Sequence, residues 1–251
     1  MKRLKIWISV LYNFLLSFRG SKADIMDAKA TVKEILNGKS LIRFGDGEFG
    51  IYNGANIHYQ KWSKELKERF DEIKSVYVNS PRTCPYLLAV PRVFMKCSGF
   101  KLLKKRVYVS SWARSRTDFI RRFPQNIVYG DAFVFEKANR EVYKKIWSDT
   151  GKEKKIVFIH NNAEYAKAFE STYDLQVFFC KCPPENAFEK IDEVKADITD
   201  LIKKNGLSAD NVMFLISMGP AGKVLAFDLS MQGYHCIDTG HCWDDPLKGL
   251  D

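Results

Sequence analysis

Apolar and polar positions along the chain follow two alternating spacings, which predict strands and helices in turn. Short runs that are apolar at nearly every position are typical of strands buried in a sheet. Such runs predict strands at residues 40–44, 75–80, 106–111, 126–135, 154–162, 175–182, 211–219 and 234–240. Apolar residues that recur every three or four positions predict helices at residues 27–38, 64–74, 115–123, 140–150, 163–172, 187–206 and 221–233.

This order of elements predicts an α/β fold, with a Rossmann-like, mainly parallel sheet and helices on both faces. Residues 21–251 are expected to form a single domain, because no repeat, low-complexity tract or linker divides them. Ligands of such sheets bind beyond the carboxyl ends of the strands. Function is therefore expected in the segments that follow predicted strands, which are "GDGEF", "NSP", "SSWARSR", "SMGPAGK" and "DTGHCW".

Residues 1–20 precede this domain and predict an amphipathic helix. Seven apolar residues recur there at helical spacing: Leu4, Trp7, Ile8, Leu11, Phe14, Leu15 and Phe18. The run from 6 to 18 is short for a bilayer span, and "SFRGSKA" is a poor signal-peptide cleavage site. Two interpretations stay open, a helix lying in a membrane interface or a helix docked on its own domain or on a partner subunit of a homo-oligomer. Trp7, Tyr12 and the basic ends favour the membrane.

The formal net charge of +10 and the pI of about 9.2 favour anionic partners, such as nucleic acid, phosphorylated ligands or a membrane surface. The positive charge is spread out and no nucleic-acid-binding motif is present, so nucleic acid is not an expected partner. The six cysteines form no C-x-x-C pair and fit neither a zinc site nor a small disulfide framework. They are expected to be free thiols in a reducing compartment.

The stretch "GDGEFG", residues 45–50, matches G-x-G-x-x-G, the pattern of a dinucleotide-binding turn. Its context argues against that function, because two carboxylates would repel a pyrophosphate and no amphipathic helix is expected after Gly50. Asp46 and Glu48 instead place two oxygen ligands together after a strand, and the glycines allow a sharp turn. Mg²⁺ and Mn²⁺ prefer such ligands together with phosphate oxygens. A solvated tight turn is the alternative.

A second candidate lies in "SMGPAGK", between a predicted strand and a helix. Gly219 and Ala221 allow a ligand to approach closely, and Pro220 suits a first helical position. Free N–H groups and Lys223 in the first turn would bind an anion, although an ordinary strand–helix turn is equally compatible with these features. His241 follows the last strand and has three possible roles: ligating a metal, contacting phosphate or capping the turn.

Four stretches occur in order along the chain, "RFGDGEF", "YGDAFVF", "CPPENAFEKIDEV" and "MGPAGKVLAFDLSMQGYHCIDTGH". Together they resemble the GT-D-type glycosyltransferases of bacteria, over the segment from about Asp24 to Trp243. These enzymes were first recognised as a domain of unknown function, in proteins that glycosylate serine-rich adhesins. The chain departs from the family pattern at Asp131, where the family often has Asn, and at Ala221-Gly222, where it often has Thr-Ala.

The resemblance implies a nucleotide-sugar-dependent glycosyltransferase with a divalent metal, Mn²⁺ or Mg²⁺, and a UDP-sugar, which is UDP-glucose in the family's known cases. The family's essential D-x-E motif maps to Asp46 and Glu48, which would be the catalytic residues. Metal binding is assigned to Asp46, Glu48 and His241. UDP-sugar binding is assigned to Arg43, Gly45, Gly219, Pro220, Ala221 and Lys223.

The acceptor is expected to be a glycan or a lipid-linked glycan at the inner face of the cytoplasmic membrane, with the chain cytoplasmic and peripheral to that membrane. Candidates for a general base are Glu48, Asp131, Asp244 and Asp245. Arg114 and Arg116 have two interpretations, as ligands of phosphate or an anionic acceptor, or as part of a solvated basic loop. A non-catalytic nucleotide- or glycan-binding subunit is the alternative function, and a phosphohydrolase with the same metal site is a third.

Overall fold

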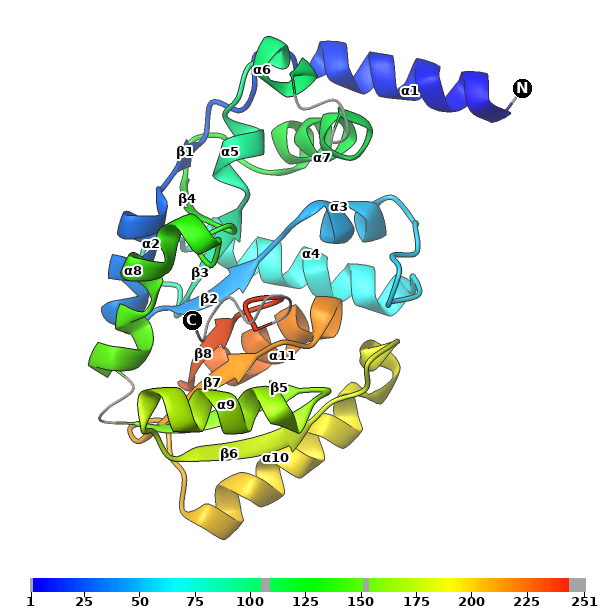
Figure 1. Ribbon diagram of the computed structural model, residues 1–251. Coiled ribbons are helices and arrows are strands. Elements are labelled where there is room, and N and C mark those ends of the chain that lie inside the picture. Colours follow the sequence, from blue (N-terminus) through cyan, green and yellow to red (C-terminus); the bar gives the residue numbers. More distant parts are fainter. Residues whose placement is uncertain (1, 105–108, 151–153, 244–251) are drawn as a thin grey trace.

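The computed structural model describes residues 2–104, 109–150 and 154–243, arranged around one eight-stranded sheet (Figure 1). The strands are β1 (Asp24–Ile25), β2 (Ser40–Arg43), β3 (Tyr86–Val90), β4 (Val128–Asp131), β5 (Lys155–His160), β6 (Val177–Lys181), β7 (Val212–Ile216) and β8 (His235–Asp238). Their order is β1-β4-β3-β2-β8-β7-β5-β6, and every pairing of neighbours is parallel. The predicted Rossmann-like α/β fold is confirmed.

Helices cover both faces of the sheet. They are α1 (Lys2–Leu16), α2 (Ala28–Leu36), α3 (Asp46–Tyr52), α4 (Lys64–Asn79), α5 (Arg92–Met95), α6 (Gly99–Leu103), α7 (Val109–Arg122), α8 (Arg140–Tyr143), α9 (Ala163–Tyr173), α10 (Ile191–Asn205) and α11 (Gly219–Met231), with short 3₁₀ turns at Lys137–Asn139 and Ala187–Lys190 and a π turn at Ile146–Thr150. One contiguous layer contains α4, α11 and α10, and the other contains α2, the π turn and α9. Both bury their apolar stripes against the nearly all-apolar strands.

The predicted strand at 75–80 is wrong, because these residues complete α4. Val76 and Val78 favour strands locally, but Phe70, Ile73 and Tyr77 continue the buried stripe of the helix. The strand expected there is instead β3, which pairs with β2. The sequence pattern did not indicate it, although all five of its residues are buried. Tertiary packing therefore overrides local strand propensity at this point.

The predicted strand at 106–111 is also replaced by a helix, since α7 begins at Val109; residues 106–108 lie outside the described part of the chain. α7 then continues through the predicted helix at 115–123. A helix also forms at Asp46, where no helix was expected. It is short because Gly45 caps its start and Asn53 ends it.

Helix α1 docks along α7, and its end lies beside α6 (Figure 1). The hydroxyl of Thr117 donates to the Asn13 carbonyl at 2.9 Å, and Phe14 and Ser17 are buried. Part of α1 therefore packs on its own domain, as one of the two interpretations predicted. None of the described helices combines the length and the apolarity needed to cross a bilayer. All six cysteines are free, as predicted.

Candidate active site

The two halves of the chain meet at β2 and β8, in the middle of the sheet. From β2 the first half extends through β3 and β4 to one edge, and β8, β7, β5 and β6 form the other half. Where the strand order reverses in this way, a crevice opens beyond the carboxyl ends of the two strands. A cleft of about 650 Å³ lies there. It is lined by residues from the segments 43–60, 110–118, 132–133, 160–161, 182–187, 217–223 and 240–241.

Most of the predicted site residues line this one cleft although they are far apart in sequence. They are Arg43, Gly45, Asp46, Glu48, Gly219, Pro220, Lys223 and His241. Each follows a strand, which is why the parallel sheet brings them to one edge. Ala221 differs from the others, because it is completely buried in the first turn of α11 and is not part of the cleft wall.

Arg43 is fixed by backbone groups on both sides of the junction. Its Nη1 donates to the Ala132 carbonyl at 2.8 Å and its Nε donates to the Asp238 carbonyl at 2.8 Å. Gly240 has a φ of +52° and lies against the guanidinium, so that a Cβ at this position would collide with Arg43. Arg43 therefore holds β2, β4 and the end of β8 together rather than extending freely into the cleft.

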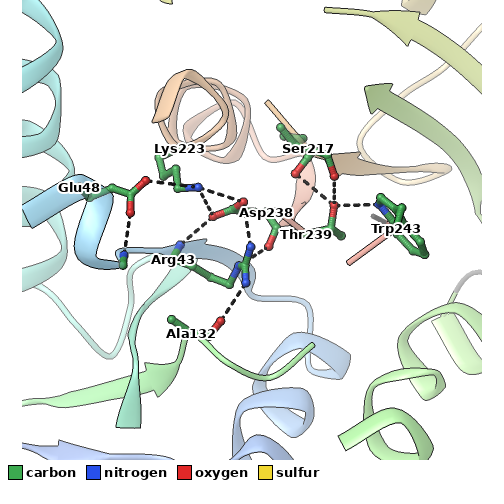
Figure 2. Close-up of polar contacts among 10 residues, drawn as sticks. Arg43, Glu48, Ala132, Ser217, Lys223, Asp238, Thr239 and Trp243 are labelled. Atoms are coloured by element: carbon green, nitrogen blue, oxygen red, sulfur yellow. Dashed lines mark hydrogen bonds and ion pairs between the residues drawn. The ribbon is translucent and has the colours of Figure 1, made fainter. Parts of the chain in front are cut away.

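A buried charge network forms the floor of the cleft (Figure 2). The Asp238 carboxylate accepts the backbone N–H of Arg43 at 3.1 Å and pairs with the guanidinium at 3.5 Å. Lys223 Nζ lies 3.2 Å from Asp238 Oδ2 and 3.5 Å from Glu48 Oε1. The other oxygen of Glu48 accepts the Gly45 N–H at 2.7 Å, which closes the capping box of α3. Two cations and two carboxylates thus compensate one another.

The network keeps Lys223 charged in spite of its burial. Burial by itself lowers the pKa of Lys223, but the negative charges of Asp238 and Glu48 outweigh that effect and the pKa is raised. The ammonium group is therefore paired with two carboxylates, whereas the sequence predicted a lysine available to bind an anion. Its position beside the cleft still contributes to the potential there.

Asp46 lies at the rim of the cleft, in the first turn of α3. Its Oδ1 accepts the Gly47 N–H at 3.1 Å, and the side chain is open to solvent on one side. Loss of water against the cleft wall, followed by the negative charge of Glu48, raises the pKa of Asp46. Glu48, by contrast, is buried, so the alternative of a tight turn with both acids solvated is wrong.

The turn before α11 forms a second wall. Gly219 has a φ of +56°, and a Cβ there would lie 2.7 Å from the ring of Tyr59. A hydrogen bond holds the segment that carries Tyr59 to the segment before α10. In it, the Asn186 N–H donates to the Tyr59 carbonyl at 2.8 Å. The small residue thus lets an aromatic ring lie directly on the backbone at the start of a helix.

His241 is exposed on the same wall, with its ring 6.0 Å from that of Tyr59. Trp243 anchors its segment, since the indole N–H donates to Thr239 Oγ1 at 3.1 Å and Thr239 in turn contacts Ser217 at 2.8 Å (Figure 2). Within the described residues, no three His, Cys, Asp or Glu side chains are grouped as a metal site. The predicted metal ligands, Asp46, Glu48 and His241, are therefore not preassembled.

A divalent metal nevertheless fits the residues present. Nucleotide-bound Mg²⁺ takes one or two protein carboxylates and completes its shell with phosphate oxygens and water. Asp46 meets this requirement because its carboxylate is open to solvent on the cleft. Glu48 is the second carboxylate nearby, although both of its oxygens already have partners.

Four other predicted residues lie away from the cleft or outside the described chain. Asp131 accepts the N–H groups of Arg92 and Phe133 and shapes the turn after β4, but it does not line the cleft. Arg116 is completely buried and donates to the carbonyls of Ser17 and Cys97, so both interpretations given for it are wrong. Arg114 does line the cleft. Asp244 and Asp245 lie outside the described residues.

Several residues of the candidate site, either in the charge network or on the cleft wall, were missed by sequence analysis. Asp238 is the centre of the charge network, although "DTGH" had indicated only His241 as a candidate. His160 ends β5 and Asn161 follows it, so the rule that ligands bind beyond the ends of strands would have included them. Asp118 lines the cleft from α7 and is contacted by Asn53 and Arg122, and no sequence signal distinguishes it from a surface helix residue.

The family model for the glycosyltransferase GT-D fold matches residues 41–245, which is most of the chain and includes the whole β2–β8 junction. The chain belongs to this family. The GT-D domain is 25% identical over 219 residues to "Probable glycosyl transferase Gly" of Streptococcus gordonii, which covers 81% of this chain and 30% of the relative. It is also 25% identical over 228 residues to "Glycosyltransferase GlyD" of Streptococcus pneumoniae serotype 4, which covers 82% of this chain and 25% of that relative. The chain thus spans less than a third of either relative.

Solved structures share the fold of the GT-D domain. One, "The highly conserved domain of unknown function 1792 has a distinct glycosyltransferase fold", aligns with a TM-score of 0.71 at 23% identity and covers 93% of this chain and 85% of that chain. Another, "A New Glycosyltransferase (DUF1792) from Streptococcus sanguinis", has a TM-score of 0.69 at 21% identity and covers 88% of this chain and 82% of that chain. Both similarities are at less than 25% identity and show a shared fold.

Proposed function

We propose that the GT-D domain transfers a hexose, glucose being the expected one, from a UDP-sugar to a hydroxyl group of a glycan. The observation that carries this proposal is the cleft at the β2–β8 junction. It combines a buried charge network, an open carboxylate at Asp46 and a glycine turn at the start of α11. Membership of a glycosyltransferase family and the names of the relatives support the reaction class.

The charge balance of the cleft supports a requirement for a metal ion. Arg43, Lys223, Glu48 and Asp238 compensate one another, and Asp46 adds a negative charge at the rim. A diphosphate would be repelled by this surface unless a cation lay between them. We assign the ion, Mn²⁺ or Mg²⁺, to Asp46 with help from Glu48 and His241. When bound, it would neutralise the charge that develops on the leaving diphosphate.

The residues of the chain would orient the donor and acceptor. We assign the diphosphate to the Gly219 N–H at the start of α11, since Gly219 lines the cleft. Pro220 has no N–H, and the Gly222 N–H donates to the Met218 carbonyl at 3.2 Å. In the reaction, the acceptor oxygen forms a bond to the anomeric carbon, the bond from that carbon to the β-phosphate oxygen breaks, and UDP leaves with the electron pair. The acceptor proton passes to a base. Of the proposed bases within the described residues, only Glu48 lines the cleft.

We further propose that the acceptor is a lipid-linked glycan and that the chain works as a peripheral protein at the inner face of the cytoplasmic membrane. The exposed apolar side of α1 supports this location. Arg114, on the α7 wall of the cleft, is placed to contact an anionic group of the acceptor.

A second candidate function is a non-catalytic subunit that binds a nucleotide or a glycan. It is favoured by the pairing of Glu48 with Lys223, which leaves one of the two motif carboxylates without a free oxygen. Such a subunit would bind a UDP-sugar without breaking it.

Incubation with UDP-glucose, Mn²⁺ and a mixture of glycan acceptors distinguishes these functions. A transferase releases UDP faster with acceptor than without it, and Asp46→Ala or EDTA abolishes the release. A binding subunit shifts its melting temperature with UDP-glucose but releases no UDP. Hydrolysis of simple phosphate esters would instead identify a phosphohydrolase, and full transfer in EDTA would remove the metal from the proposal.

A further inference from the structure

Helix α1 has two different apolar sides. Val10, Asn13, Phe14 and Ser17 recur at helical spacing and face α7, where the Ser17 hydroxyl lies 3.4 Å from the Ala113 carbonyl. A second set on another side of the helix is exposed: Leu4, Trp7, Ile8, Leu11 and Leu15. A contiguous row of large apolar side chains in water marks an interaction surface. Docking of α1 on its own domain therefore leaves this second side without a partner among the described residues.

The exposed row continues onto α6. Phe18 follows the same spacing, and its ring meets that of Phe100 edge to face at 4.9 Å. Gly99 makes this contact possible, because a Cβ there would collide with the Phe18 ring. Phe100 keeps 69% of its surface exposed. Figure 1 shows α6 beside the end of α1. We call the following residues the apolar platform: Leu4, Trp7, Leu11, Leu15, Phe100 and Leu103.

The segments that carry the platform contain no acidic residue. Residues 1–23 and 92–117 together contain thirteen of the forty Lys and Arg and none of the thirty Asp and Glu. The remaining residues therefore contain twenty-seven basic and thirty acidic side chains, a net charge of −3. Lys5, Arg19, Lys101 and Lys104 are described and exposed. The net charge of +10 of the whole chain thus comes from the two segments around the platform.

We propose that the apolar platform, with the basic side chains around it, docks the domain on an anionic lipid bilayer, with α1 lying in the interface and α6 as a second point of insertion. Apolar burial and attraction to anionic headgroups act together in such binding, and each basic residue near the surface strengthens it. Binding of the platform to a bilayer does not require sugar transfer; only the lipid-linked acceptor is taken from the proposed function.

A bilayer fits this surface better than a second copy of the chain. A two-fold interface would bring the same patch of both copies together, and here each patch is basic without acidic residues. Such a pairing would place like charges opposite one another, whereas anionic headgroups complement them. A second copy is therefore kept as an outcome of the test.

The orientation of α7 links the platform to the cleft. One side of α7 contacts α1 through Thr117, and another lines the cleft through Ser111, Arg114 and Asp118. A bilayer beneath the platform would then lie about one helix diameter, roughly 10 Å, from the α7 wall of the cleft. A lipid-linked acceptor would approach the site from that wall.

Vesicle flotation of the whole 251-residue chain tests the proposal. The probes are vesicles of phosphatidylcholine with phosphatidylglycerol and vesicles of phosphatidylcholine alone. We expect flotation with the first, weakening at high salt, and little with the second. Leu11→Asp and Phe100→Asp should each reduce the bound fraction about tenfold, since each removes the burial of one large apolar side chain. Met231→Asp, at a site 51% exposed on α11, is the matched control and should float like the wild type.

Melting temperatures and UDP-glucose binding of all three variants keep the outcomes distinct. Lost flotation with unchanged melting and unchanged UDP-glucose binding supports the platform. Flotation of Phe100→Asp equal to that of the wild type would overturn the role of α6, and no flotation of the wild type would overturn the bilayer. A dimer in light scattering that Leu11→Asp dissociates would assign the surface to a second copy. None of these results depends on whether the chain transfers a sugar.

Discussion

At the scale of single residues, the cleft depends on charges that compensate one another out of water. Asp238 touches both Arg43 and Lys223, and Lys223 reaches on to Glu48. Buried ions are tolerated in this way only when each has a partner, because an unpaired charge loses its hydration without compensation. The site is therefore sensitive to any substitution that removes one member of the network.

Asp238→Asn tests this network. It leaves Lys223 with Glu48 as its only described counter-charge and weakens the hold on Arg43, so the free energy of unfolding should fall by about 3 kcal/mol. Urea denaturation measures the change. The control Glu68→Gln breaks the exposed pair with Lys64 and should change the free energy by less than about 0.5 kcal/mol. Equal effects of the two variants would contradict the importance of the buried network.

Asp46→Asn tests whether the ionised Asp46 carboxylate lowers the stability of the folded chain. The pKa of Asp46 is raised by burial and by Glu48, so the folded state binds its proton more tightly than the unfolded state. Stability should therefore increase as the pH falls through the range just above the ordinary aspartate pKa and decrease as the carboxylate ionises. The variant should melt at a higher temperature than the wild type at pH 7 without metal, and at the same temperature in strong acid. A lower melting temperature at pH 7 would refute this.

Gly219→Ala tests the turn against Tyr59. The new methyl group meets the Tyr59 ring, whereas Gly206→Ala places a methyl group in open space at nearly the same φ of +57°. Both should lose about 1 kcal/mol of stability from the backbone conformation. Only Gly219→Ala should weaken UDP-glucose binding, by about tenfold if one hydrogen bond to the diphosphate is lost. Equal binding by both variants would place the diphosphate elsewhere.

At the scale of elements, α1 packs one side on α7 and leaves a second apolar side exposed. Periodicity identified the helix, but both of its sides are apolar, so the pattern alone could not say which side packs on α7. The choice is made by Asn13, Ser17 and the buried Arg116, whose guanidinium binds the Ser17 carbonyl. The sequence suggested a solvated loop or a ligand contact for Arg116, because arginine is rarely buried without an acidic partner.

Phe14→Ala and Leu11→Ala form a matched pair that tests which side is docked. Phe14 is buried and its loss should lower the free energy of unfolding by about 3 kcal/mol. Leu11 is exposed, so its loss should change that free energy by less than about 0.5 kcal/mol. Chemical denaturation without lipid gives both values. The reverse order would mean that the other side of α1 packs on the domain.

The order of elements could be predicted largely from sequence, and the exceptions have physical reasons. β5, β6 and β7 contain apolar runs, β8 is shorter and includes His235 and Asp238, and all four were identified near their observed bounds. The run at 75–80 was misassigned because its β-branched residues lie at the end of a long helix, and β3 was missed although all its residues are buried. Local sequence patterns reflect the propensity of each residue for helix or strand. The structure that forms also depends on the residues against which each segment packs.

At the scale of the whole molecule, the rule that ligands bind beyond parallel strands predicted that the candidate site residues would converge. It brought Asp46, Glu48, Gly219 and His241 to one cleft without knowledge of the strand order. The partners of each side chain could not be predicted in this way. That Lys223 is paired with Asp238 depends on distances across the β2–β8 junction, which no sequence spacing encodes.

The whole molecule also separates its charges. A basic, apolar side lies at α1 and α6, and the rest of the chain carries a small negative net charge. The cleft lies between these parts, with α7 as the shared wall. This arrangement suits a soluble, metal-bound donor and an acceptor held at a surface.

Isothermal titration of UDP-glucose into the chain tests the central claim, that the β2–β8 cleft is a metal-dependent UDP-sugar site. We expect saturable binding in Mn²⁺ that disappears in EDTA and in Asp46→Asn, while the control Glu68→Gln binds like the wild type. Binding in EDTA or by Asp46→Asn that equals binding by the wild type in Mn²⁺, or no binding by the wild type in Mn²⁺, would contradict the account.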